Sequence, residues 1–110
     1  MANRPFHRVQ AADGAEITYI LGADDDPATV DNVDAESSLP NGNRYAATIL
    51  TLNQIDTIMR RWEQTGECLA GAYLRVPDLV IVRKPGVSSM TRALKDLLSA
   101  GQVADLPRLE

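Results

Sequence analysis

Residues 44–66 read RYAATILTLNQIDTIMRRWEQTG, and the change of pattern inside this stretch decides the fold class. The first seven residues have an extended pattern, which predicts a strand. Thr51 and Gln54 then match a helix capping box, in which the Thr hydroxyl accepts a main-chain N–H bond. Gly66 predicts the end of the helix, and between these limits apolar residues recur at helical spacing: Leu52, Ile55, Met59 and Trp62. A strand that leads directly into an amphipathic helix indicates mixed α and β structure.

A second amphipathic helix is predicted after Pro85 and Gly86, which break the chain. Ser88 or Ser89 can cap its start, and Gly101 can end it. Its apolar residues are Val87, Met90, Leu94, Leu97 and Leu98. Because helices of this length are marginal alone in water, we expect both helices to bury their apolar sides on a sheet.

Strands are predicted on either side of these helices. Residues 6–10 and 16–21 flank Asp13-Gly14, a pair suited to a hairpin turn because both positions tolerate positive φ. A second hairpin is predicted from residues 69–76 and 79–82, joined by Pro77-Asp78. Gly71 inside its first strand indicates a bulge or a close backbone approach. A short last strand at residues 103–106 is an open alternative to a docked tail.

These elements predict an α+β fold, a two-layer sandwich with a mainly antiparallel sheet of about five strands. The two amphipathic helices are expected to pack on one face of the sheet. The predicted order is two strands, a long loop, strand, helix, two strands and helix, which from residue 44 on matches the order of a ferredoxin-like unit. A chain of 110 residues has the size of a single domain, so we expect one domain over residues 1–110. No apolar run is long enough for a membrane span and no secretory signal precedes the fold, which predicts a cytoplasmic protein without membrane contact.

The acidic charge of the chain is concentrated in residues 22–43, which we expect to form a long loop. The whole sequence has fifteen acidic and eleven basic residues, for a net charge of −4. Six of the acids and none of the bases lie in this segment, so the rest of the chain has nine acids against eleven bases. The six acids are Asp24, Asp25, Asp26, Asp31, Asp34 and Glu36.

Three interpretations of the acidic segment are open. Its carboxylates can attract a basic protein partner, bind a hard cation such as Ca²⁺, or form a solvated loop held open by self-repulsion. Asp24-Asp25-Asp26-Pro27 lacks the glycine and the closing glutamate of a calcium-binding hand, so we expect no metal site. The leading hypothesis is therefore a small non-enzymatic interaction module that regulates or inhibits a basic partner through these six residues.

The alternative hypothesis is a small-molecule binder or minor enzyme with a cleft that uses His7, Cys68 or Tyr73. A cysteine and a histidine can form a nucleophile and base pair, but no flanking motif marks Cys68 as a nucleophile. The glycines do not have phosphate-binding spacing, so we expect no cofactor. A lone cysteine also excludes an internal disulfide and, with one histidine, a structural zinc site.

Two further expectations concern partners. Arg60, Arg61, Arg83 and Lys84 are balanced by nearby acids in an acidic chain with few aromatic residues, so we expect no nucleic-acid binding. Trp62 lies on the apolar side of the first helix, which predicts a core position rather than an interface anchor. A sandwich with one open sheet face or edge makes a homodimer a third possibility.

Overall fold

The computed structural model describes residues 6–110, in which six strands form one sheet. The strands lie in the order β1 (Phe6–Gln10), β2 (Glu16–Ile20), β3 (Asn32–Ser38), β4 (Arg44–Thr51) and β5 (Leu79–Val82). Neighbours among the first four strands are antiparallel, whereas β5 runs parallel to the end of β4. The short β6 (Arg108–Leu109) pairs with the start of β4. The predicted α+β class with a mainly antiparallel sheet is confirmed.

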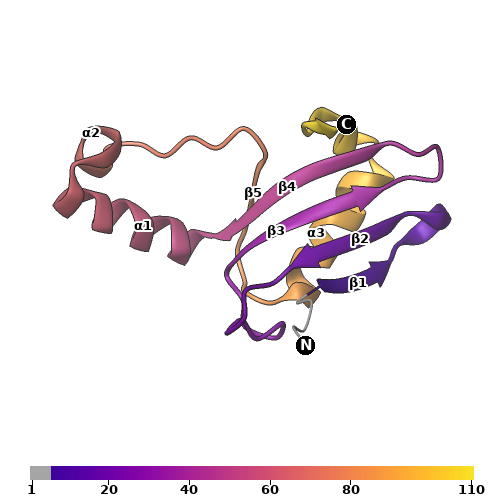
Figure 1. Ribbon diagram of the computed structural model, residues 1–110, viewed down its shortest axis with the longest axis horizontal. Helices are drawn as coiled ribbons and strands as arrows, with labels where there is room; N and C mark the ends of the chain where they lie inside the picture. Colours follow the sequence, from indigo (N-terminus) through magenta and orange to yellow (C-terminus); the bar gives the residue numbers. More distant parts are fainter. Residues whose placement is uncertain (1–5) are drawn as a thin grey trace.

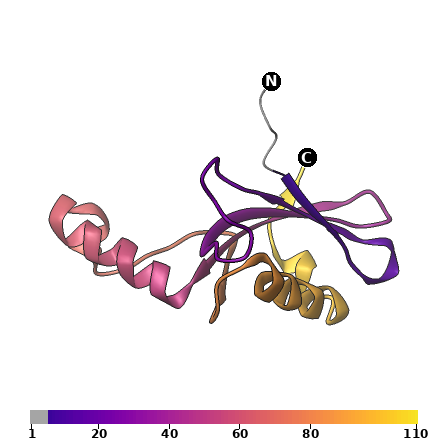
Figure 2. The ribbon, with the colours of Figure 1, turned by 90° about the horizontal axis from the view of Figure 1, so that it is seen from below.

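Two main helices are placed very differently relative to this sheet. Helix α3 (Val87–Ser99) lies along one sheet face, and no helix among residues 6–110 covers the other face (Figure 2). Helix α1 (Leu52–Thr65) and the short α2 (Glu67–Gly71) project from the end of β4, away from the sheet (Figure 1). Two short 3-10 helices complete the fold, η1 (Ala12–Gly14) and η2 (Gln102–Asp105). No helix in this part of the chain has the length and apolar character that a membrane crossing requires.

The core lies between α3 and the inner face of the sheet. Alternate residues of the strands point to this side, as the period of two requires. Met90 and Leu94 of α3 are fully buried against them. The sheet contributes Ile17, Tyr19, Val33, Ala35, Ala47 and Ile49. Burial of one such large apolar side chain is worth about 1.5 to 3 kcal/mol, so α3 fixes the inner face of the sheet.

The first hairpin is confirmed, and its turn uses the predicted residues. Asp13 and Gly14 both have positive φ, at 62° and 81°. The connection from Gln10 to Glu16 is longer than a two-residue turn, because it contains η1. A bond from the Ala11 N–H to the Ala15 carbonyl closes it.

The segment 22–43 is not one long loop, because it contains β3. Val33, Ala35 and Ser37 point to the core, and the polar residues between them point outward. This alternation is a strand signal, but small inward residues and aspartates, which are uncommon in strands, masked it. The loop proper therefore ends near Asp31.

The second predicted hairpin is wrong. Residues 69–76 form no strand; Cys68, Leu69, Ala70 and Gly71 all have positive φ and make one left-handed turn, after which the chain returns to β5. Because β5 is parallel to β4, the chain must cross back before it can pair, and residues 52–78 provide that crossover. The last strand lies at Arg108–Leu109 instead of 103–106, and the order from residue 44 on is not that of a ferredoxin-like unit.

Helix α1 begins and ends as predicted but does not pack on the sheet. The Thr51 hydroxyl accepts the Gln54 N–H bond at 3.1 Å, and Gly66 ends the helix with φ 88°. Within the described chain α1 has no buried residue, so the predicted core position of Trp62 is wrong; its side chain is half-buried. We call α1, α2 and the return to residue 77 the arm. The arm lengthens the molecule to 45 × 35 × 26 Å.

Candidate functional site

The six acidic residues singled out from the sequence lie on two adjoining parts of the molecule. Asp24, Asp25, Asp26 and Asp31 belong to the turn between β2 and β3, and Asp34 and Glu36 lie on the outer side of β3. None of the six is buried. We call these six residues the acidic surface; it lies on the turn and on the sheet face that α3 leaves open.

The main chain under the acidic surface is held in place by hydrogen bonds. Asp25 and Asp26 accept N–H bonds from Gly22 and Ala28 at 2.7 and 2.9 Å, which fix two local turns. The Val30 carbonyl accepts the Gly86 N–H bond at 2.7 Å, which ties the turn to the start of α3. Gly86 has φ 99°, and a Cβ there would lie 2.6 Å from the Ala28 carbonyl oxygen. The segment expected to be a solvated, self-repelling loop therefore has a defined shape.

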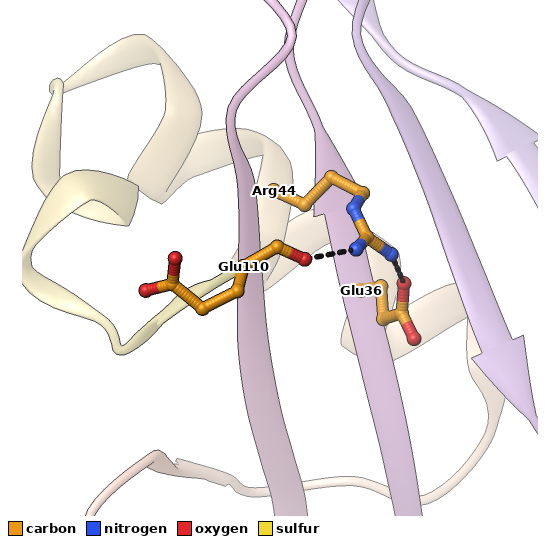
Figure 3. A network of polar contacts seen from close by, with 3 residues as sticks. All are labelled: Glu36, Arg44 and Glu110. Atoms are coloured by element: carbon orange, nitrogen blue, oxygen red, sulfur yellow. Dashed lines mark hydrogen bonds and ion pairs between the residues drawn. The ribbon is translucent and has the colours of Figure 1, made fainter.

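Bonds on the outer side of β3 involve two of the carboxylates. Glu36 pairs with Arg44 at 3.1 Å, and the same guanidinium donates to the main-chain oxygen of Glu110 at 2.9 Å (Figure 3). Asp34 accepts a bond from the Thr48 hydroxyl at 3.2 Å. Within residues 6–110, Glu36 is the only one of the six acids in an ion pair. Most of the negative charge is thus not neutralised by these residues.

Apolar side chains border the acidic surface on the open sheet face. The strand register places Ile20 of β2 directly opposite Asp34 of β3 on one side and Phe6 of β1 on the other. Ile81 of β5 lies on the same face beyond β4. These three side chains are 37 to 51% exposed. The open face therefore combines carboxylates with exposed apolar side chains.

His7, Cys68 and Tyr73 are not brought together. His7 is half-buried on β1, while Cys68 lies in α2 and Tyr73 follows it on the arm. Helix α2 lies at one end of the longest axis of the molecule, and β1 lies in the other half, within the sheet (Figure 1). A Cys–His catalytic pair is therefore absent from the described residues. Among those residues no group of three or more His, Cys, Asp or Glu side chains could hold a metal ion.

His7 nevertheless lines a cleft of about 510 Å³ between β1 and the first half of α3. Its walls include Val9, Pro27, Ala28 and Val87, and the polar lining consists of His7, Ser88, Thr91, Arg92 and Lys95. We call it the β1–α3 cleft. The four polar residues of α3 are spaced by three, one and three, so the sequence pattern marks them as one helix side. Sequence reasoning missed them because polar residues on an amphipathic helix are ordinarily its solvated side and do not by themselves indicate a cleft.

Thr91, which lines the β1–α3 cleft, forms a buried pair of hydroxyl groups with Tyr19. The Tyr19 and Thr91 oxygens are 2.8 Å apart, and the residues are 0% and 7% exposed. Burial raises the pKa of Tyr19 from 10.0 to about 12, although the bond to Thr91 lowers it in part. Tyr19 is thus a neutral donor and acceptor at physiological pH.

We compared the chain with protein-family models, curated proteins and solved structures. None of the three comparisons gives a match. The candidate sites therefore rest on the geometry and chemistry of the chain itself.

The arm presents further apolar surface at its left-handed turn and at the start of α1. Leu69 is 79% exposed, and Tyr73 and Leu52 are about half exposed. Left-handed conformation costs a non-glycine residue roughly 1 to 2 kcal/mol, and three consecutive residues adopt it here. Gly71 closes the turn against α1, where a Cβ would lie 2.1 Å from the Met59 carbonyl oxygen. The close backbone approach predicted for Gly71 is present, but on the arm; self-association stays a prediction that sedimentation would test.

Proposed function

We propose that this chain is a small binding module that captures a basic protein partner through the acidic surface and thereby regulates or inhibits that partner. One observation supports this most: five of the six carboxylates have no ion-pair partner within residues 6–110, although their main chain is fixed by hydrogen bonds. Uncompensated charge speeds encounter with an oppositely charged surface. A pre-shaped backbone reduces the entropy lost on binding.

The open sheet face would provide the second part of the interface. Carboxylates alone give fast but salt-sensitive association, whereas apolar side chains at the same place slow dissociation. Ile20 beside Asp34 supplies such a contact. We propose the cytoplasm as the compartment of this activity, because an odd cysteine such as Cys68 is uncommon in secreted chains.

The test compares two variants with equal charge change at different places. In the first, all six acids of the acidic surface become Asn or Gln. Asn keeps a carbonyl oxygen at positions 25 and 26 and so preserves the two turn bonds. The control neutralises six acids elsewhere on the chain: Asp56, Glu63, Glu67, Asp78, Asp96 and Asp105. Circular dichroism verifies that both variants fold.

The probe is a fluorescent peptide of lysine and arginine residues, followed by anisotropy at low and at moderate salt. We expect the first variant to bind about tenfold more weakly than the wild type at low salt, and the control to change less than about threefold. Equal losses in both variants would show that net charge, rather than the acidic surface, attracts the peptide. A basic protein that is crosslinked to this chain in the native host supports the proposal only on one condition. That protein, once purified, must bind the acidic-surface variant more weakly than the control variant.

A further inference from the structure

The β1–α3 cleft combines an apolar wall with cationic side chains. Its volume of about 510 Å³ lies within the range of small-molecule sites. Val9, Pro27 and Val87 provide apolar surface, and Arg92 and Lys95 stand on one side of α3. No carboxylate lines this cleft within residues 6–110. In a chain with a net charge of −4, a cleft lined by cations and no acids selects for negatively charged ligands.

Neither Asp96, which follows Lys95 on α3, nor the acids near the cleft in the chain form an ion pair with these cations within residues 6–110. Asp26 lies just before the wall residue Pro27, but its side chain accepts the Ala28 N–H bond. Asp13 lines a smaller hollow of about 280 Å³ that shares Lys95 with the cleft. Neither Arg92 nor Lys95 forms an ion pair within the described part of the chain. Both cations are therefore available to a ligand.

The buried hydroxyl pair has one hydrogen more than its own bond uses. Tyr19 and Thr91 each carry one hydroxyl hydrogen, and the bond between them uses one of the two. No other hydrogen bond of either side chain occurs within residues 6–110. Either oxygen can be the donor in this bond. The phenol is the stronger acid, which favours Tyr19 as the donor and leaves the hydrogen of Thr91 for a further acceptor. Thr91 lines the cleft, so a ligand oxygen is the acceptor that would satisfy it.

We propose that the β1–α3 cleft binds a small organic carboxylate, with its apolar body on Val9, Pro27 and Val87. The carboxylate accepts the hydroxyl bond of Thr91 and lies near Arg92 and Lys95. An amine of the same shape is repelled by both cations, and an alcohol keeps the hydroxyl contact but gains no charge attraction. This inference is independent of the acidic surface, since no carboxylate of that surface takes part.

Octanoate is the probe, added to the whole isotope-labelled chain and followed through amide NMR shifts. We expect saturable shifts confined to the start of α3, β1 and residues 27–28, with a Kd on the order of 1 mM or tighter. Octylamine should bind at least about tenfold more weakly than octanoate, with octanol between the two. Acetate, which lacks the apolar body, should give no saturable shift.

Two sets of variants locate the contacts. Arg92→Gln with Lys95→Gln changes only exposed side chains and should weaken octanoate about tenfold while octanol binding stays the same. The matched control, Arg83→Gln with Lys84→Gln, removes two exposed cations that do not line the cleft and should change neither ligand. Thr91→Val should weaken both ligands, and Thr91→Ser should restore them.

The inference is overturned by any of three results. The first is that octanoate causes amide shifts which do not saturate and are spread over the whole surface. The second is octylamine binding as tightly as octanoate. The third is equal octanoate affinity in the variant pair at 92 and 95 and in the control pair at 83 and 84.

Discussion

Helices α1 and α3 have similar lengths, 14 and 13 residues, and equally pronounced apolar sides, yet only α3 buries that side against the sheet. Helix α3 buries Val87, Met90, Thr91 and Leu94, whereas α1, all of it described, buries none of its residues. An amphipathic pattern therefore predicts a helix and identifies the side that avoids water. It does not identify the surface on which that side lies.

The chain before each helix explains the difference. Thr51 ends β4 and is also the cap of α1, so the helix continues outward with no turn to redirect it. Before α3, Gly86 reverses the chain with a positive φ, and its N–H bond to Val30 holds the reversal against the body. The connection, not the helix, places α1 on the arm and α3 on the sheet.

The largest expected effect separates the two helices by stability. Leu94→Ala on α3 should lower the free energy of unfolding by about 2 to 5 kcal/mol, because a fully buried leucine leaves a cavity. Trp62→Ala on α1 should cost less than about 1 kcal/mol globally, because the side chain is half-buried outside the core. Urea unfolding measures both. Comparable losses would show that the arm packs on the body in solution.

A pH series tests the side-chain hydrogen bond between α3 and the sheet, which joins Thr91 and Tyr19. The pKa of Tyr19 is raised to about 12 in the folded chain, so between pH 10 and 12 the unfolded chain loses its proton first. Stability is full below pH 10 and falls as the pH rises, by about 2 kcal/mol at pH 12. Tyr19→Phe should lack this component while keeping all other alkaline losses. Urea unfolding at each pH gives the free energy of unfolding of both proteins. If that free energy falls equally with pH in the wild type and in Tyr19→Phe, the raised pKa of Tyr19 does not contribute.

The smallest expected effect concerns the arm alone. Gly71→Ala and Gly66→Ala both place alanine at similar positive φ, 81° and 88°. At Gly71 the new Cβ meets the Met59 carbonyl, whereas at Gly66 nothing lies within 4 Å. Gly71→Ala should therefore open the arm more readily by about 1 kcal/mol, seen as roughly fivefold faster amide exchange in α1. The amides of α3 should be unaffected in both variants, and a change there would show that arm and body unfold together.

The strands that sequence reasoning found were those with large alternating side chains or turn residues of known geometry. Asp13-Gly14 adopts the positive φ values that its chemistry predicts. Strand β3 was missed because Ala35 and Ser37 are small and the outward residues are polar. Residues 69–76 were wrongly predicted as a strand because their apolar character suits a strand as well as an exposed turn.

For the candidate sites, the sequence showed where the charge lies but not the hydrogen bonds that hold the main chain beneath it. The clustering of Asp24 to Glu36 indicated an acidic surface. The N–H bonds that the carbonyls of Asp31 and Val30 accept from Thr51 and Gly86 depend on tertiary structure. The β1–α3 cleft was out of reach for the same reason. His7 and Thr91 are 84 residues apart in the chain, and only the fold places them around one space.

The sequence by itself determined the α+β class, the limits of α1 from Thr51 to Gly66, and the location of the charge, because caps, periodicity and charge are properties of neighbouring residues. Tertiary structure alone decided that β5 pairs in parallel with β4, that α1 leaves the sheet while α3 covers it, and that a cation-lined cleft opens beside β1. These features depend on contacts between residues far apart in the chain, whose free energy is gained only once the whole sheet has formed.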